Sequence, residues 1–134
     1  GYRWGESWVD SLCKWAENKY GKPVGLLGHS AGAFLALGHI CGHWFFHSHA
    51  VSRVALLSLW FPEYAKLKPR NFNDFQVLFL CGSRDFTKPA TIYAYNIAAQ
   101  SKGEAAYVEV DADHTVWNSP DVIPILLKWF GNVS

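Results

Sequence analysis

The sequence lacks several features that would point to particular classes of protein. It has no methionine, only three cysteines and no run of five or more like charges, and its formal net charge is +1. We therefore have no reason to expect binding to nucleic acid or to an anionic membrane. No apolar run approaches the roughly 18 residues of a transmembrane helix, and no signal peptide is expected at the N-terminus. Because Met is absent, we expect Gly1 to be a processed end or the start of an expressed segment or fragment.

The cysteines are too few and too widely spaced to indicate a disulfide framework or a metal site. Cys13, Cys41 and Cys81 form no Cys-x-x-Cys pair, and each lies in an apolar stretch where buried thiols are common. We expect all three to be reduced, which favours a cytoplasmic location.

What the sequence has is ample material for a hydrophobic core. The 134 residues fit one compact domain, so residues 1–134 are predicted to form a single α/β domain. Half of the residues are hydrophobic and 16% are aromatic. A chain of this size can fold on such a core without a disulfide or a metal.

Apolar runs typical of buried strands alternate with segments typical of helices. Strands are predicted at residues 24–27, 53–59, 76–81 and 106–110. Helices are predicted at residues 5–19, 33–46, 91–102 and 120–130. This order predicts a three-layer α/β/α sandwich around a short, mainly parallel sheet of about four strands. In such sheets the functional residues gather at the carboxyl ends of the strands.

The segment Gly28-His29-Ser30-Ala31-Gly32 fits the pattern G-x-S-x-G, in which a serine nucleophile sits on a sharp turn from a strand into a helix. The pattern alone arises by chance in roughly one chain of this length in twenty. An apolar strand before it and an apolar helix after it strengthen the assignment, and we expect glycines on both sides to make room for the turn. Ser30 is therefore the predicted nucleophile; the alternative is a glycine-rich turn with an incidental serine.

A nucleophilic serine needs a base, and His114 is the histidine that directly follows the last predicted strand. His29 is next to Ser30, but its side chain is expected to point elsewhere. Three further histidines are spaced by four residues along the helix after Ser30, which could bind a metal: His39, His43 and His47. A metal-dependent hydrolase is thus an alternative, although we predict no metal and no cofactor.

The base needs an acid to orient it, and Asp85 follows the third predicted strand. Its rivals are Glu63, just past the second strand, and Asp111 and Asp113, which are too close in sequence to His114 to fold back easily onto its ring. Asp85 is the favoured acid. Its alternative role is to cap the helix that follows it.

With Ser30, Asp85 and His114 in this order after predicted strands, the chain resembles the α/β-hydrolase family, in particular its carboxylesterases and lipases. Four segments carry the resemblance. Residues 2–7 are similar to the tail of the family's Arg-Gly-x-Gly-x-Ser loop, with one glycine lost or replaced. Residues 28–32 match its nucleophile elbow, residues 82–89 resemble its G-x-x-D-x-x-x-P acid loop, and Asp113-His114 with the helix after Pro120 resembles its histidine loop and last helix.

The resemblance covers the C-terminal portion of the family, because several strands and a helix normally precede the point where this sequence begins. That portion normally supplies one of the two backbone N–H donors of the oxyanion hole. The resemblance assigns the other donor to Ala31. Losing one donor typically costs ~3 kcal/mol of transition-state stabilisation. The strand at Val24 to Leu27, interior in the family, would lie at a sheet edge, so we expect a homodimer or larger assembly that covers it.

The short connection between the second and third predicted strands implies that no lid domain is inserted there and that the site is open. Aromatic residues near the site could form an apolar wall for an acyl group, or could be ordinary core residues: Trp60, Phe61, Phe86 and Trp117. The sequence thus predicts a serine hydrolase of carboxylic esters, with short-chain esters favoured and thioesters open. The alternative is a catalytically silent module of the same fold.

Overall fold

The computed structural model describes residues 2–21, 25–46, 51–62 and 66–131, and for residues 2–10 and 42–46 the backbone only. Its four strands form one parallel sheet in the order β1-β2-β3-β4: β1 (Leu26–His29), β2 (Arg53–Leu57), β3 (Gln76–Gly82) and β4 (Glu104–Val110). The helices are α1 (Tyr2–Tyr20), α2 (Ala31–Phe46), α3 (Lys88–Ala98) and α4 (Val122–Phe130). Two short 3-10 helices lie at Pro69–Phe72 and Val116–Asn118.

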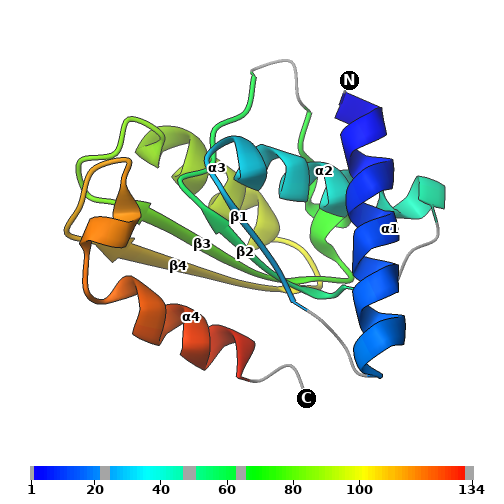
Figure 1. Cartoon of the computed structure of the whole chain (residues 1–134). Helices are drawn as coiled ribbons and strands as arrows, with labels where there is room; N and C mark the ends of the chain where they lie inside the picture. The colour runs from blue at the N-terminus through cyan, green and yellow to red at the C-terminus, as the bar shows by residue number, and fades with distance from the viewer. Residues whose placement is uncertain (1, 22–24, 47–50, 63–65, 132–134) are drawn as a thin grey trace.

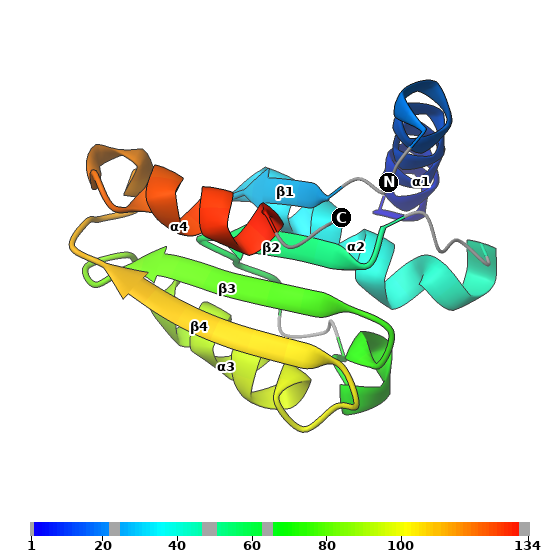
Figure 2. The same cartoon turned by 90° about the horizontal axis from the view of Figure 1, so that it is seen from below.

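The sheet lies between two layers of helices (Figures 1 and 2). Because successive side chains of a strand point to opposite faces, Val54 and Leu56 of β2 pack with α2 and α3, whereas Ala55 and Leu57 pack with α4. Helix α1 packs against α2. The predicted three-layer α/β/α fold with a short parallel sheet is therefore confirmed.

Several element boundaries differ from the predicted ones. Strand β1 runs from Leu26 through Gly28 to His29, so the turn begins at Ser30; Val24, predicted as its first residue, lies outside the described residues. Helix α3 begins at Lys88 instead of residue 91, because Pro89 has the backbone angle that a first helical turn requires.

The N-terminal segment is helical where the resemblance suggested a loop, since α1 already begins at Tyr2. The described part of the connection between β2 and β3, residues 58–62 and 66–75, holds one short 3-10 helix and no lid domain. Within the described residues, no helix has both the length and the apolar character that crossing a membrane requires.

Candidate active site

Ser30 occupies a strained turn between β1 and α2. Its φ is 58°, in the left-handed region that residues other than glycine seldom adopt, while its N–H still donates to the carbonyl of Leu57 at 2.9 Å. A Cβ atom on Gly28 would overlap the backbone of Gly32, so the close approach of strand and helix requires glycine at position 28. A Cβ on Gly32 would meet nothing within 4 Å, so the expectation that both glycines make room was wrong for Gly32.

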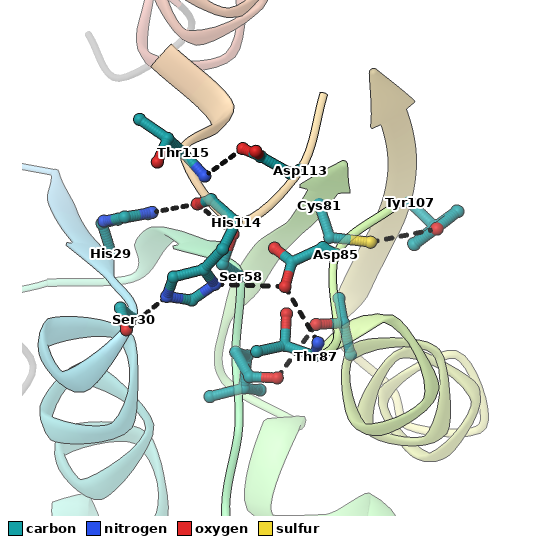
Figure 3. Close-up of polar contacts among 12 residues, drawn as sticks. His29, Ser30, Ser58, Cys81, Asp85, Thr87, Tyr107, Asp113, His114 and Thr115 are labelled. Carbon is teal, nitrogen blue, oxygen red and sulfur yellow. Dashed lines mark hydrogen bonds and ion pairs between the residues drawn. The ribbon is translucent and has the colours of Figure 1, made fainter. Parts of the chain in front are cut away.

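The structure brings Ser30, His114 and Asp85 into one chain of hydrogen bonds at the carboxyl edge of the sheet (Figure 3). Ser30 Oγ lies 2.8 Å from His114 Nε2, and His114 Nδ1 lies 3.1 Å from Asp85 Oδ1. With the ring proton on Nδ1, His114 donates to the carboxylate and accepts from the serine hydroxyl. In this arrangement Nε2 is free to take the serine proton.

The Asp85 side chain is fully buried and is surrounded by hydrogen-bond donors. Its Oδ1 accepts from the backbone N–H of Thr87 at 2.9 Å. Burial alone would raise the pKa of the Asp85 carboxyl. The Ser58 hydroxyl, Thr87 and His114 outweigh burial and hold this pKa below its ordinary value of 3.8. Among the described residues, Asp85 Oδ2 and Thr87 Oγ1 lack a partner at good hydrogen-bond geometry.

The loops that carry Asp85 and His114 are joined by their backbones. Ser83 N–H donates to the Val110 carbonyl at 2.8 Å, and Arg84 N–H donates to the Ala112 carbonyl at 3.0 Å. A Cβ on Gly82 would overlap the carbonyl oxygens of Ala112 and Asp113, so this close contact requires glycine there. The distance from Asp85 to His114 is thus set by the end of the β3–β4 ladder.

The rival acids are engaged elsewhere or lie outside the described residues. Asp111 forms an exposed ion pair with Arg84, and Asp113 accepts from the Thr115 N–H at 2.9 Å. Glu63 lies outside the described residues.

The histidine series on α2 is described only in part. His39 is buried, and its ring lies edge-on to Phe75 at 6.1 Å. The side chain of His43 and all of His47 lie outside the described part. No group of three or more potential metal ligands occurs among the side chains that the structure describes.

An apolar cavity of about 260 Å³ opens beside Ser30, lined by Ser30, Ala31, Phe34, Trp60, Phe86 and Thr87. Two of the four aromatic residues predicted for a substrate wall, Trp60 and Phe86, line it. Phe61 is instead buried against Tyr93, and Trp117 packs on the ring of His29 at 5.9 Å.

Two residues of the cavity, Phe34 and Thr87, were not predicted from the sequence. Phe34 is four residues after Ser30 on α2, and residues four apart lie on the same side of a helix. This spacing could have predicted from the sequence that Phe34 lies beside Ser30. Thr87 is near the cavity because it follows Asp85 by two residues in the acid loop.

Ala31 is the first residue of α2, so its N–H has no carbonyl partner within the helix. It lies beside Ser30 on the wall of the cavity. The N-terminus of a helix also favours negative charge. The structure therefore offers at this point both a donor and a favourable potential for an anionic oxygen.

The likeness to known proteins lies in the fold. No protein-family model matches the sequence, and no curated protein matches it either. A solved structure of a zinc-bound, cold-adapted esterase from an Arctic intertidal metagenomic library matches 97% of this chain and 60% of its own chain, with a TM-score of 0.65 and 14% identity. The chain therefore shares the fold of this structure over most of its length.

A second solved structure supports the same fold. It is a protein of unknown function from Agrobacterium tumefaciens str. C58, which matches over 88% of this chain and 57% of its own, with a TM-score of 0.65 and 20% identity. The present chain thus spans about three fifths of the length of the solved structures it resembles.

Proposed function

We propose that the protein is a serine hydrolase of carboxylic esters, with Ser30 as nucleophile, His114 as general base and acid, and Asp85 as the group that orients His114. The observation that carries the proposal is the 2.8 Å contact between Ser30 Oγ and His114 Nε2, with Asp85 on the opposite ring nitrogen. The esterase-like fold agrees with it.

In the proposed reaction, Ser30 Oγ attacks the acyl carbon while its proton moves to His114 Nε2. The Ala31 N–H donates to the oxygen that becomes negative. Collapse of the tetrahedral intermediate breaks the ester bond, and the leaving alkoxide takes the proton from His114. Water then attacks the acyl-enzyme and gives a proton to His114. The bond between the acyl carbon and Ser30 Oγ breaks, His114 returns the proton to Oγ, and the acid is released. Asp85 stays ionised throughout because its pKa is held low.

The cavity favours a short apolar acyl group. Its volume of about 260 Å³ lies just below the range of about 300–1,000 Å³ typical of small-molecule sites. We propose that Trp60 and Phe86 contact the acyl group together with Phe34. A thioester of the same acyl group could be cleaved by the same three residues, Ser30, His114 and Asp85.

The proposal is tested with a fluorophosphonate probe and with turnover of p-nitrophenyl acetate. Wild-type protein should be labelled and should hydrolyse the ester, whereas the matched variant Ser30→Ala should do neither. Folded wild-type protein that neither reacts with the probe nor turns over the ester would refute the enzyme and favour a catalytically silent module.

We also propose that β1 pairs with another copy of the chain to form a homodimer. Within the described residues β1 pairs with β2 alone, and Leu27 is 40% exposed. Exposed apolar edge strands commonly pair with other chains. Light scattering after size-exclusion chromatography should give a dimer mass that Leu27→Lys reduces; a monomer mass at all concentrations would contradict this.

A further inference from the structure

The backbone carbonyl of His114 lies within reach of donors from two other strands (Figure 3). His29 Nε2, from the last residue of β1, lies 3.0 Å from this carbonyl oxygen. The hydroxyl of Ser58, from the residue just after β2, donates to it at 3.5 Å. The loop that carries His114 is therefore tied to the ends of both β1 and β2, in addition to its backbone bonds with the acid loop.

His29 also restrains the imidazole from the side. Its ring lies 5.3 Å from the ring of His114, and Phe86 lies 4.7 Å from the same ring. His29 is adjacent to Ser30 in sequence, so the end of β1 carries both the proposed nucleophile and a donor to the backbone carbonyl of His114. Any shift of β1 against the His114 loop would change both contacts together.

Ser58 has a backbone conformation that residues other than glycine seldom adopt. It is fully buried with a φ of 54°, and its N–H donates to the Leu80 carbonyl at 2.8 Å. Such a strained backbone persists only where its surroundings fix it, and strain of this kind gathers at functional sites. Here the turn places the hydroxyl near both the His114 carbonyl and the Asp85 carboxylate, whose pKa the serine lowers. The one hydroxyl proton can be donated to either of these two acceptors, but to only one at a time.

We propose that His29 and Ser58 are positioning residues: together they hold the His114 carbonyl so that the imidazole stays between Ser30 and Asp85. The inference rests on the proposed function for its catalytic consequence. A reacting group must be held to within about 0.5 Å of its productive place. The 3.5 Å contact of Ser58 is long for a hydrogen bond, so His29 should carry more of this restraint.

The test compares His29→Leu, which removes the donor, with His29→Gln, whose amide nitrogen can replace Nε2, and with Ser58→Ala. His29→Leu should lower kcat for p-nitrophenyl acetate about tenfold with KM nearly unchanged, and Ser58→Ala somewhat less. His29→Gln should recover most of the lost rate. Because both donors address one carbonyl, the loss in the double variant His29→Leu with Ser58→Ala should differ from the product of the two single losses, whereas independent residues would give that product.

A second measurement needs no substrate and so separates this inference from the proposed function. In protein labelled with 15N-histidine, the Nδ1 proton of His114 should exchange slowly with water in the wild type and faster in His29→Leu and Ser58→Ala. His29→Gln should restore slow exchange. Unchanged exchange in both donor-removing variants would overturn the inference. If the wild type hydrolyses no ester but the donor-removing variants exchange the His114 Nδ1 proton faster, the proposed function is overturned and the positioning role is not. If His29→Leu does not fold, Ser58→Ala and His29→Gln still decide the outcome.

Discussion

Ser30 and Ser58 stand just after the neighbouring strands β1 and β2 in nearly the same strained backbone conformation, with φ of 58° and 54°. Each donates its N–H to the next strand of the sheet, and each has its hydroxyl near His114. Ser30 is partly buried beside a cavity and meets the ring nitrogen Nε2. Ser58 is fully buried and meets the backbone carbonyl instead.

The contrast shows that backbone strain alone does not make a nucleophile. A serine needs a basic atom as its acceptor and a path for the substrate, and only Ser30 has both. A carbonyl oxygen cannot take up the proton of Ser58, which is fully buried and does not line the cavity beside Ser30.

Removing the two hydroxyls should have very different consequences. Ser30→Ala should lower kcat by a factor on the order of 10⁶, the loss typical of a missing serine nucleophile. Ser58→Ala should lower it about tenfold or less. Steady-state hydrolysis of p-nitrophenyl acetate checks both. Similar losses in the two variants would remove the distinction between the serines.

Asp85→Asn should lower kcat by a factor on the order of 10⁴, because an amide no longer holds the ring in the tautomer that leaves Nε2 unprotonated. Asp113→Asn is the matched control, since Asp113 bonds the backbone of Thr115 and not the ring. The same assay should show wild-type turnover for this control. Loss of activity in Asp113→Asn with retention in Asp85→Asn would point to a different acid.

The two glycines of the elbow should respond oppositely to alanine. Gly28→Ala should destabilise the fold by about 1–3 kcal/mol, because the new Cβ overlaps the backbone of Gly32. Gly32→Ala should be neutral or stabilising by up to about 1 kcal/mol, since its Cβ meets open space on a helix. Urea unfolding measures both free energies. A stable Gly28→Ala variant would contradict the close packing assigned to the turn of Ser30.

The smallest expected effect concerns pH. The pKa of Asp85 is lowered on folding, so its contribution to stability is present above the ordinary value of 3.8 and is lost as the pH falls through the folded value. Ser58→Ala should raise the pKa of Asp85 in the folded state, because it removes one of the groups that lower it. The difference in unfolding free energy between the wild type and this variant should therefore become smaller as the pH falls. Ser30 does not contribute to the pKa shift of Asp85, so the difference in unfolding free energy between the wild type and Ser30→Ala should stay constant over the same pH values. Urea unfolding at several pH values below 6 measures both free-energy differences. A difference for Ser58→Ala that grows as the pH falls would contradict the role of Ser58 in lowering the pKa of Asp85.

Much of this arrangement could be predicted from the sequence because it follows from strand order. Apolar runs alternating with helices fix a parallel sheet, and the carboxyl ends of parallel strands bring the residues after them to one edge. Ser30, Asp85 and His114 were predicted to lie together in this way, and the structure places them in one chain of hydrogen bonds. The confirmed part is the three-layer fold.

The supporting residues could not be predicted, because their roles depend on contacts between distant segments. Nothing local to Ser58 indicates a left-handed backbone, and His29 was expected to point away from the site, whereas its Nε2 lies 3.0 Å from the His114 carbonyl. Likewise, the need for glycine at position 82 appears only when the acid loop meets the backbone of Ala112 and Asp113.

The most direct test of the account is to locate the covalent label. Wild-type protein treated with a fluorophosphonate is digested, and the modified peptide is identified by tandem mass spectrometry. The account predicts one phosphonylated residue, Ser30, with Ser58 unmodified even at long reaction times. A label on Ser58 or on another residue, or folded protein that takes up no label, would contradict the assignment of Ser30 as the nucleophile.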